Sequence, residues 1–155
     1  MGQGARADSL LRQAYAMMAA AQPVQFQRIG RGTVTANRAE LAARRGDDAT
    51  AAALADSART LWTGVLPPID ARWSTLGRVE ALLLQDRRQS AAAVARLTAL
   101  LDTLQSMPHP SYYTYRHTEA TLADVFDRSG QPDSAAAHRA LSRPGAPLAR
   151  RGIRR

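Results

Sequence analysis

The chain has 155 residues, of which 45% are hydrophobic and 22% are charged, so its composition is that of a globular protein and not of a disordered one. Aromatic residues make up only 5%, and the absence of Cys excludes disulfides and thiolate metal sites while fitting any compartment. The net charge is +8 and all 21 basic residues are Arg, which indicates a GC-rich genome more than selection for phosphate binding.

Apolar periodicity and boundary residues predict an all-α chain. Helices are expected near residues 7–21, 33–45, 48–62, 69–85, 89–106, 110–128 and 132–142. Prolines stand at several of the expected ends, namely Pro67, Pro68, Pro108, Pro110, Pro132 and Pro144. The segment 23–32 is left open, because Pro23 could start a helix that Gly30 and Gly32 then interrupt.

Two helices around a short polar turn form a pattern that occurs three times. The turns are centred on Gly46, Asp86 and Gly130, which are 40 and 44 positions apart. Each second helix opens with Ser or Thr beside a run of alanines. A fourth copy begins at Gly4, 42 residues before Gly46, and contains only the second helix.

These stretches resemble the tetratricopeptide repeat, a helix–turn–helix unit that stacks into a right-handed superhelix. The resemblance implies small residues at the positions where helices cross. Counted from the turns, these positions in the first helices hold Ala39 and Ala123, whereas the middle copy departs from the pattern with Val79. The corresponding residues are Ala51, Ala58, Ala91, Thr98, Ala135 and Ser142 in the second helices, and Ser9 and Ala16 in the half-repeat. The stretch from Trp73 to Gly77 matches the family's W-x2-L-G opening. The period exceeds the usual length of about 34 residues, so a HEAT-like or other α–α superhelix is the alternative to a tetratricopeptide-like α-solenoid.

The expected organisation is one helical repeat domain over residues 1–142, followed by a disordered basic tail over residues 143–155. Within the domain we expect the half-repeat 4–21 and the pairs 33–62, 69–106 and 110–142. Helix 7–21 carries Leu10, Tyr15 and Met17, which are too apolar for a capping face. We therefore expect either the C-terminal portion of a longer repeat protein or self-association through residues 7–21.

The sequence offers no constellation for catalysis, a cofactor or a metal. His109, His117 and His138 lack the i, i+4 spacing of a zinc-binding helix, and there is no G-x-S-x-G, P-loop or dinucleotide motif. We expect no catalytic residue, no metal ligand and no cofactor. The carboxylates Asp124 and Asp127, one helical turn apart, are interpreted as a solvated face.

One aromatic stretch, HPSYYTYRHTEATL, allows two interpretations. Tyr112, Tyr115, Glu119 and Leu122 are spaced to form one mainly apolar stripe on a helix. This stripe either packs against the preceding helix pair or forms a patch that faces a ligand.

The resemblance implies a function as well as a fold. First helices of tetratricopeptide units line a concave groove, and by register the groove positions are Glu40, Arg44, Trp73, Glu80, His117, Asp124 and Arg128. We therefore expect a noncatalytic module that binds a peptide or protein segment. Larger bacterial signalling proteins, such as serine/threonine kinases and transcriptional regulators, often carry such arrays, so a C-terminal sensor region of one of these is an alternative.

Nucleic acid and membranes are not expected partners. The Arg-rich tail could contact nucleic acid nonspecifically and with strong salt dependence, but the body has no basic stripe or aromatic platform. The longest weakly polar run, residues 14–21, is too short to span a bilayer, and the N-terminus has no apolar signal core. We expect a cytoplasmic location.

Overall fold

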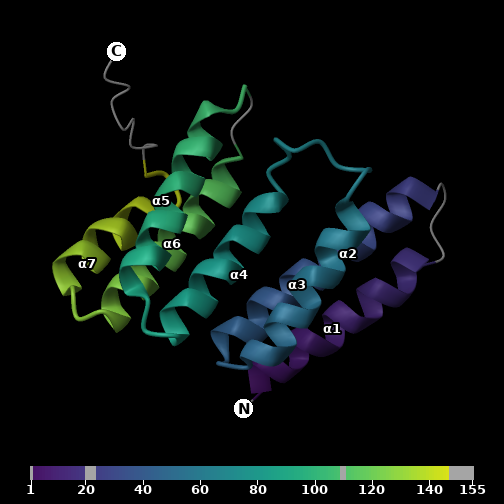
Figure 1. The fold of residues 1–155 in the computed structure, drawn as a ribbon, viewed down its shortest axis with the longest axis horizontal. Coiled ribbons are helices and arrows are strands. Elements are labelled where there is room, and N and C mark those ends of the chain that lie inside the picture. Colours follow the sequence, from purple (N-terminus) through teal and green to yellow (C-terminus); the bar gives the residue numbers. More distant parts are fainter. Residues whose placement is uncertain (1, 20–23, 109–110, 147–155) are drawn as a thin grey trace. The chain divides into compact units, whose positions relative to one another are not determined.

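A computed structural model describes residues 2–19, 24–108 and 111–146, and within them it contains helices and no strands (Figure 1). The expectation of an all-α chain is confirmed. The helices are α1 (Gly2–Ala19), α2 (Val24–Arg44), α3 (Asp48–Trp62), α4 (Trp73–Asp86), α5 (Ser90–Ser106), α6 (Tyr112–Arg128) and α7 (Pro132–Leu141). Of the tail over residues 143–155, for which we predicted disorder, residues 147–155 lie outside the described part.

The chain divides into two compact units, Met1–Val79 and Glu80–Arg155, each of which is described by itself. The first unit contains α1, α2, α3 and the first half of α4. The second contains the remainder of α4 together with α5, α6 and α7.

The helix α2 differs most from its predicted extent, because it begins at Val24 and not near residue 33. Gly30 and Gly32 lie inside it, so they do not interrupt a helix, which was the possibility left open. Both glycines sit where another side chain comes close: a Cβ on Gly30 would stand 2.7 Å from Met18 Sδ, and one on Gly32 would stand 2.4 Å from Trp62 Nε1. They are therefore helix residues kept small by packing.

In the first unit, α2 packs against both α1 and α3. Its core contains Trp62, which is fully buried and donates a hydrogen bond from Nε1 to the Ile29 carbonyl at 3.2 Å. Small buried side chains also occur along both α2 and α3. These are the fully or almost fully buried residues Ala36, Ala39, Ala43, Ala51, Ala55 and Ala58. The alanines therefore let α2 and α3 approach closely, as their abundance indicated.

Polar contacts join α1 to α2. Asp8 accepts from Arg38 at 3.2 Å, and Arg31 donates to the Tyr15 hydroxyl while stacking over its ring. None of the α1 side chains that the structure describes is fully buried, and Leu10 and Met17 are 56% and 70% exposed. Self-association through residues 7–21 stays a prediction.

The half-repeat register within α1 is wrong. Gly4 lies inside the helix and is not a turn residue, because α1 already begins at Gly2. Ser9 and Ala16, which that register makes helix contacts, are exposed.

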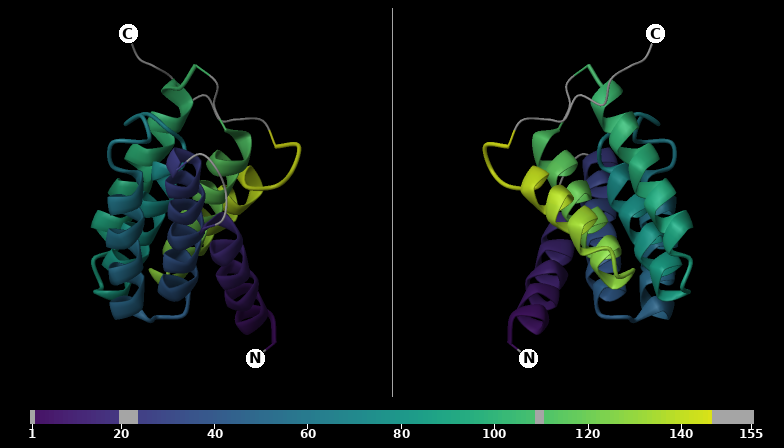
Figure 2. Two further views of the ribbon diagram at one scale, coloured as in Figure 1. Left: turned by 90° about the vertical axis from the view of Figure 1, so that its right-hand side faces the viewer. Right: turned by 90° about the vertical axis from the view of Figure 1, so that its left-hand side faces the viewer.

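In the second unit, α6 lies between α5 and α7 and packs against both (Figures 1 and 2). Tyr115, Glu119 and Leu122 of the aromatic stripe are buried in this packing, whereas Tyr112 is 57% exposed. The interpretation of the stripe as a packing face is therefore correct for its last three members, and the ligand-facing alternative fails for them.

Three turns of the structure share one backbone geometry. The residues with positive φ at these turns are Gly46, Arg88 and Gly130, which are 42 positions apart in each step. In each turn the next residue donates its amide to a carbonyl five positions back: Asp47 to Ala42, Gln89 to Leu84 and Gln131 to Phe126, at 3.0, 2.9 and 2.9 Å. The middle turn is therefore centred on Arg88, and its predicted centre at Asp86 is wrong by two residues.

The same 42-residue period governs which small residues are buried. The fourth residue after each N-cap is Ala51, Ala93 or Ala135, and all three have no exposed surface. In the preceding helices the matching residues are Ala39, Ala81 and Ala123, which are at most 1% exposed. The register of the middle copy is corrected accordingly: Ala93 replaces Ala91, which is exposed, and Ala81 replaces Val79.

Candidate interaction surface

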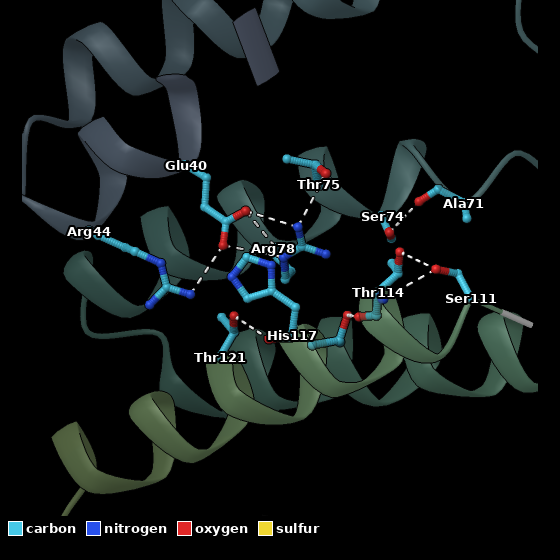
Figure 3. A network of polar contacts seen from close by, with 11 residues as sticks. Glu40, Arg44, Ala71, Ser74, Thr75, Arg78, Ser111, Thr114, His117 and Thr121 are labelled. Atoms are coloured by element: carbon cyan, nitrogen blue, oxygen red, sulfur yellow. Dashed lines mark hydrogen bonds and ion pairs between the residues drawn. The ribbon is translucent and has the colours of Figure 1, made fainter. Parts of the chain in front are cut away.

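The predicted groove residue Glu40 is buried and lies in an ion-pair network of the first unit (Figure 3). Its carboxylate is 3.1 Å from Arg44 Nη2, one turn further along α2. On the other side it is 2.9 Å from Arg78 Nη2 in α4. Arg78 Nη2 also donates to the Thr75 hydroxyl at 3.2 Å. The structure thus brings together Glu40 and Arg44, and adds Arg78 to them.

This network places two guanidinium groups around one carboxylate. Arg78 is only 3% exposed, so its charge depends on Glu40 for compensation. Its Nη1 atom is buried and has no hydrogen-bond partner within the described residues. Glu40 is therefore engaged inside the first unit, where its ion pair with Arg78 links α2 to α4.

Trp73 also serves the interior of the first unit. Its Nε1 donates to the Pro67 carbonyl at 2.9 Å, and its ring meets Trp62 edge to face, with centroids 5.2 Å apart. Leu76 and Gly77, the other members of the W-x2-L-G match, are buried. The match therefore lies at the packed start of α4, where it fixes the connection that leaves α3.

In the second unit, Glu80 and Arg128 form ion pairs between helices. Glu80 of α4 pairs with Arg96 of α5 at 2.7 Å, and Arg128 of α6 pairs with Asp86 of α4 at 3.0 Å. All four side chains are between 24% and 43% exposed, so solvent screens both pairs. They remain within reach of a binding partner.

His117 and Asp124 lie on α6, seven residues apart, and both are partly exposed. The His117 ring is tilted against Tyr113, with the centroids 5.9 Å apart. Tyr113 is 79% exposed and is the most exposed large hydrophobic side chain that the structure describes. Tyr113 is not one of the seven groove positions that the sequence predicts.

Of the seven predicted positions, Glu40, Arg44 and Trp73 belong to the first unit, and the other four belong to the second. Arg78 is the network residue that the sequence analysis missed. The corrected period supplies the missing signal, because the positions 42 residues before and after Arg78 are Ala36 and Ala120. At this position Arg78 replaces the Ala of the two neighbouring copies, and it makes the ion pair with Glu40.

Within the described residues, no group of three or more His, Asp or Glu side chains could hold a metal ion. No helix in that part of the chain is both long and apolar enough to cross a bilayer. Comparisons with protein-family models, with curated proteins and with solved structures found no match for this chain.

Proposed function

We propose that this chain is a noncatalytic module that binds a peptide or protein segment on a surface of repeated helix pairs similar to a tetratricopeptide or other α–α solenoid. The observation that carries the proposal is the 42-residue recurrence of one turn and two buried alanines, at Gly46, Arg88 and Gly130 and in the helices on both sides. Repeated helix pairs bury their small residues against one another and leave long polar faces available to partners.

The exposed side chains of the second unit provide the most accessible part of the proposed surface. Glu80, His117, Asp124 and Arg128 combine both charge signs with an imidazole, and Tyr113 adds an exposed aromatic ring beside His117. Mixed charges with one or two aromatic anchors are typical of surfaces that recognise peptides. In the first unit, Glu40 and Trp73 are engaged internally, so we propose that they shape the surface and do not contact the ligand directly.

The main alternative is nonspecific contact with nucleic acid through the Arg-rich tail, which lies mostly outside the described residues. Binding of this kind weakens steeply as salt concentration rises. The other alternative, a sensor region of a bacterial kinase or transcriptional regulator, is compatible with the main proposal, because it describes a larger protein that would contain such a module.

Selection of peptides from a random library on the immobilised chain tests the proposal. We expect selected peptides to bind in solution, and we expect Asp124→Asn or His117→Ala to weaken that binding. Asp102→Asn, an exposed change on α5, is the matched control and should leave binding unchanged. Failure to select any peptide, together with salt-sensitive oligonucleotide binding, would favour the nucleic-acid alternative.

A further inference from the structure

The helix α1 has one half-buried side and one exposed side. The half-buried side includes Asp8, Tyr15 and Met18, which contact α2 at Arg38, Arg31 and Gly30. Exposed residues recur every three or four positions on the opposite side, so they form one continuous stripe. We call this stripe the outer face of α1; its described members are Ala5, Arg6, Ser9, Leu10, Arg12, Gln13, Ala16 and Met17.

Large and small side chains occupy this outer face in a regular order. Leu10 and Met17 are 56% and 70% exposed and lie two helical turns apart. Each follows a small residue, Ser9 or Ala16, and Gln13 lies midway between the two pairs. If the helix direction is reversed about Gln13, each large residue falls on the position of a small one.

This order suits an antiparallel pair of α1 helices from two copies of the chain. With Gln13 facing Gln13, Leu10 of one copy lies level with Ala16 of the other, and Met17 lies level with Ser9. Large side chains then fill the space left by small ones, as in close-packed protein interiors. A parallel pair would instead set Leu10 against Leu10 and Met17 against Met17, and leave the small residues without a filling partner.

The charges on the outer face favour the same direction. Arg12 is paired with Asp8 of its own helix at 2.8 Å. In a parallel pair the Arg6 side chains of the two copies would lie side by side and repel each other. In the antiparallel pair each Arg6 lies beside the C-terminal end of the other α1, where the helix carbonyls carry partial negative charge.

We propose that the outer face of α1 binds the same face of a second copy of this chain, antiparallel, about a two-fold axis that passes between the Gln13 residues. Such a contact is isologous, because each copy contributes the same surface. It covers Leu10 and Met17 of both copies, and its small area makes it a weak, reversible interface. None of the seven predicted groove positions lies on α1, so the pairing is independent of the proposed peptide binding.

Disulfide crosslinking of the full chain tests this inference, because the sequence contains no Cys and an introduced Cys is the sole thiol. Four single variants are oxidised in a glutathione buffer: Gln13→Cys, Ser9→Cys, Met17→Cys and, as the matched control on α3, Ala53→Cys. All four positions are exposed, so the fold should be kept, which circular dichroism checks. Covalent dimer is measured against time by nonreducing electrophoresis.

We expect Gln13→Cys to link to itself at least about tenfold faster than Ala53→Cys, because the pair raises the effective concentration of the two thiols. Ser9→Cys and Met17→Cys should each link to themselves slowly, since eight residues of helix separate identical positions by about 12 Å, beyond the reach of a disulfide. A mixture of Ser9→Cys and Met17→Cys should link quickly. Equal rates for Gln13→Cys and Ala53→Cys would overturn the inference, and so would fast self-linking of Ser9→Cys, which indicates parallel helices.

Discussion

Glu40 and Arg78 lie 38 residues apart in the sequence and form a buried ion pair at 2.9 Å. The carboxylate belongs to α2 and the guanidinium to α4. Since each side chain is at most 6% exposed, neither charge can be hydrated if its partner is removed.

Glu40→Gln should therefore lower the free energy of unfolding by about 3–5 kcal/mol, because it leaves the Arg78 charge buried without compensation. Replacement of both residues by Met should recover a large part of the loss. Urea denaturation measures both effects. Glu80→Gln, which breaks an exposed pair, is the control and should change stability by less than about 1 kcal/mol. An equally small effect of Glu40→Gln would show that the buried pair does not stabilise the unit.

The corrected register predicts where a larger side chain is not tolerated. Ala93→Leu, like Ala51→Leu and Ala135→Leu, should overpack a helix contact and cost about 1–3 kcal/mol. Ala91→Leu changes an exposed residue on the same helix and should be nearly neutral. Thermal unfolding of the four variants tests this. Similar melting of Ala91→Leu and Ala93→Leu would mean that the 42-residue register is incorrect.

The middle turn has a non-glycine residue where the other two turns have glycine. Arg88 has φ of 61°, in the left-handed region that is unfavourable for a side chain with a Cβ atom. Arg88→Gly should therefore stabilise the chain by about 0.5–1 kcal/mol, and Gly130→Arg should destabilise it by a similar amount. Chemical denaturation compares the two. Destabilisation by Arg88→Gly would contradict the assigned turn.

The packing of α1 on α2 should weaken at low pH. Burial raises the pKa of Asp8, but the hydrogen bonds from Arg12 and Arg38 and their positive charges outweigh it, so the pKa lies below its ordinary value of 3.8. The carboxylate thus stabilises α1 on α2 above pH 3.8, and this contribution is lost as the pH falls through the lowered pKa. We expect Asp8→Asn to reduce hydrogen-exchange protection of α1 at neutral pH, and the difference from the wild-type chain to vanish in acid. A difference independent of pH would contradict this.

The comparison of sequence with structure shows which local signals are sufficient. The extent of α3 was predicted to the residue, because Gly46 forms the turn and Asp47 caps the helix by accepting from the Thr50 amide at 3.2 Å. The middle turn was misplaced because Arg88 adopts a glycine-like conformation that its identity does not indicate. The start of α2 was missed because the glycines that admit Met18 and Trp62 look like helix breakers when the tertiary contacts are unknown.

The candidate surface was less predictable than the fold. The positions of Glu80, His117, Asp124 and Arg128 on partly exposed helix faces follow from helical periodicity. The burial of Glu40 does not, because it depends on Arg78, a residue of another helix. Arg78 can be recognised as unusual only once the 42-residue period is known from the structure, because the equivalent residues of the other two copies are Ala36 and Ala120.

Titration of the isotopically labelled chain with a selected peptide, followed by NMR, tests the proposed function most directly. The account predicts that the largest shifts fall on residues of α4 and α6 around Glu80, His117, Asp124 and Arg128, with small shifts around Asp102 on α5. It also predicts that the dissociation constant changes much less with salt than nonspecific binding of nucleic acid would. Shifts confined to the last residues of the chain, lost when salt is added, would contradict it.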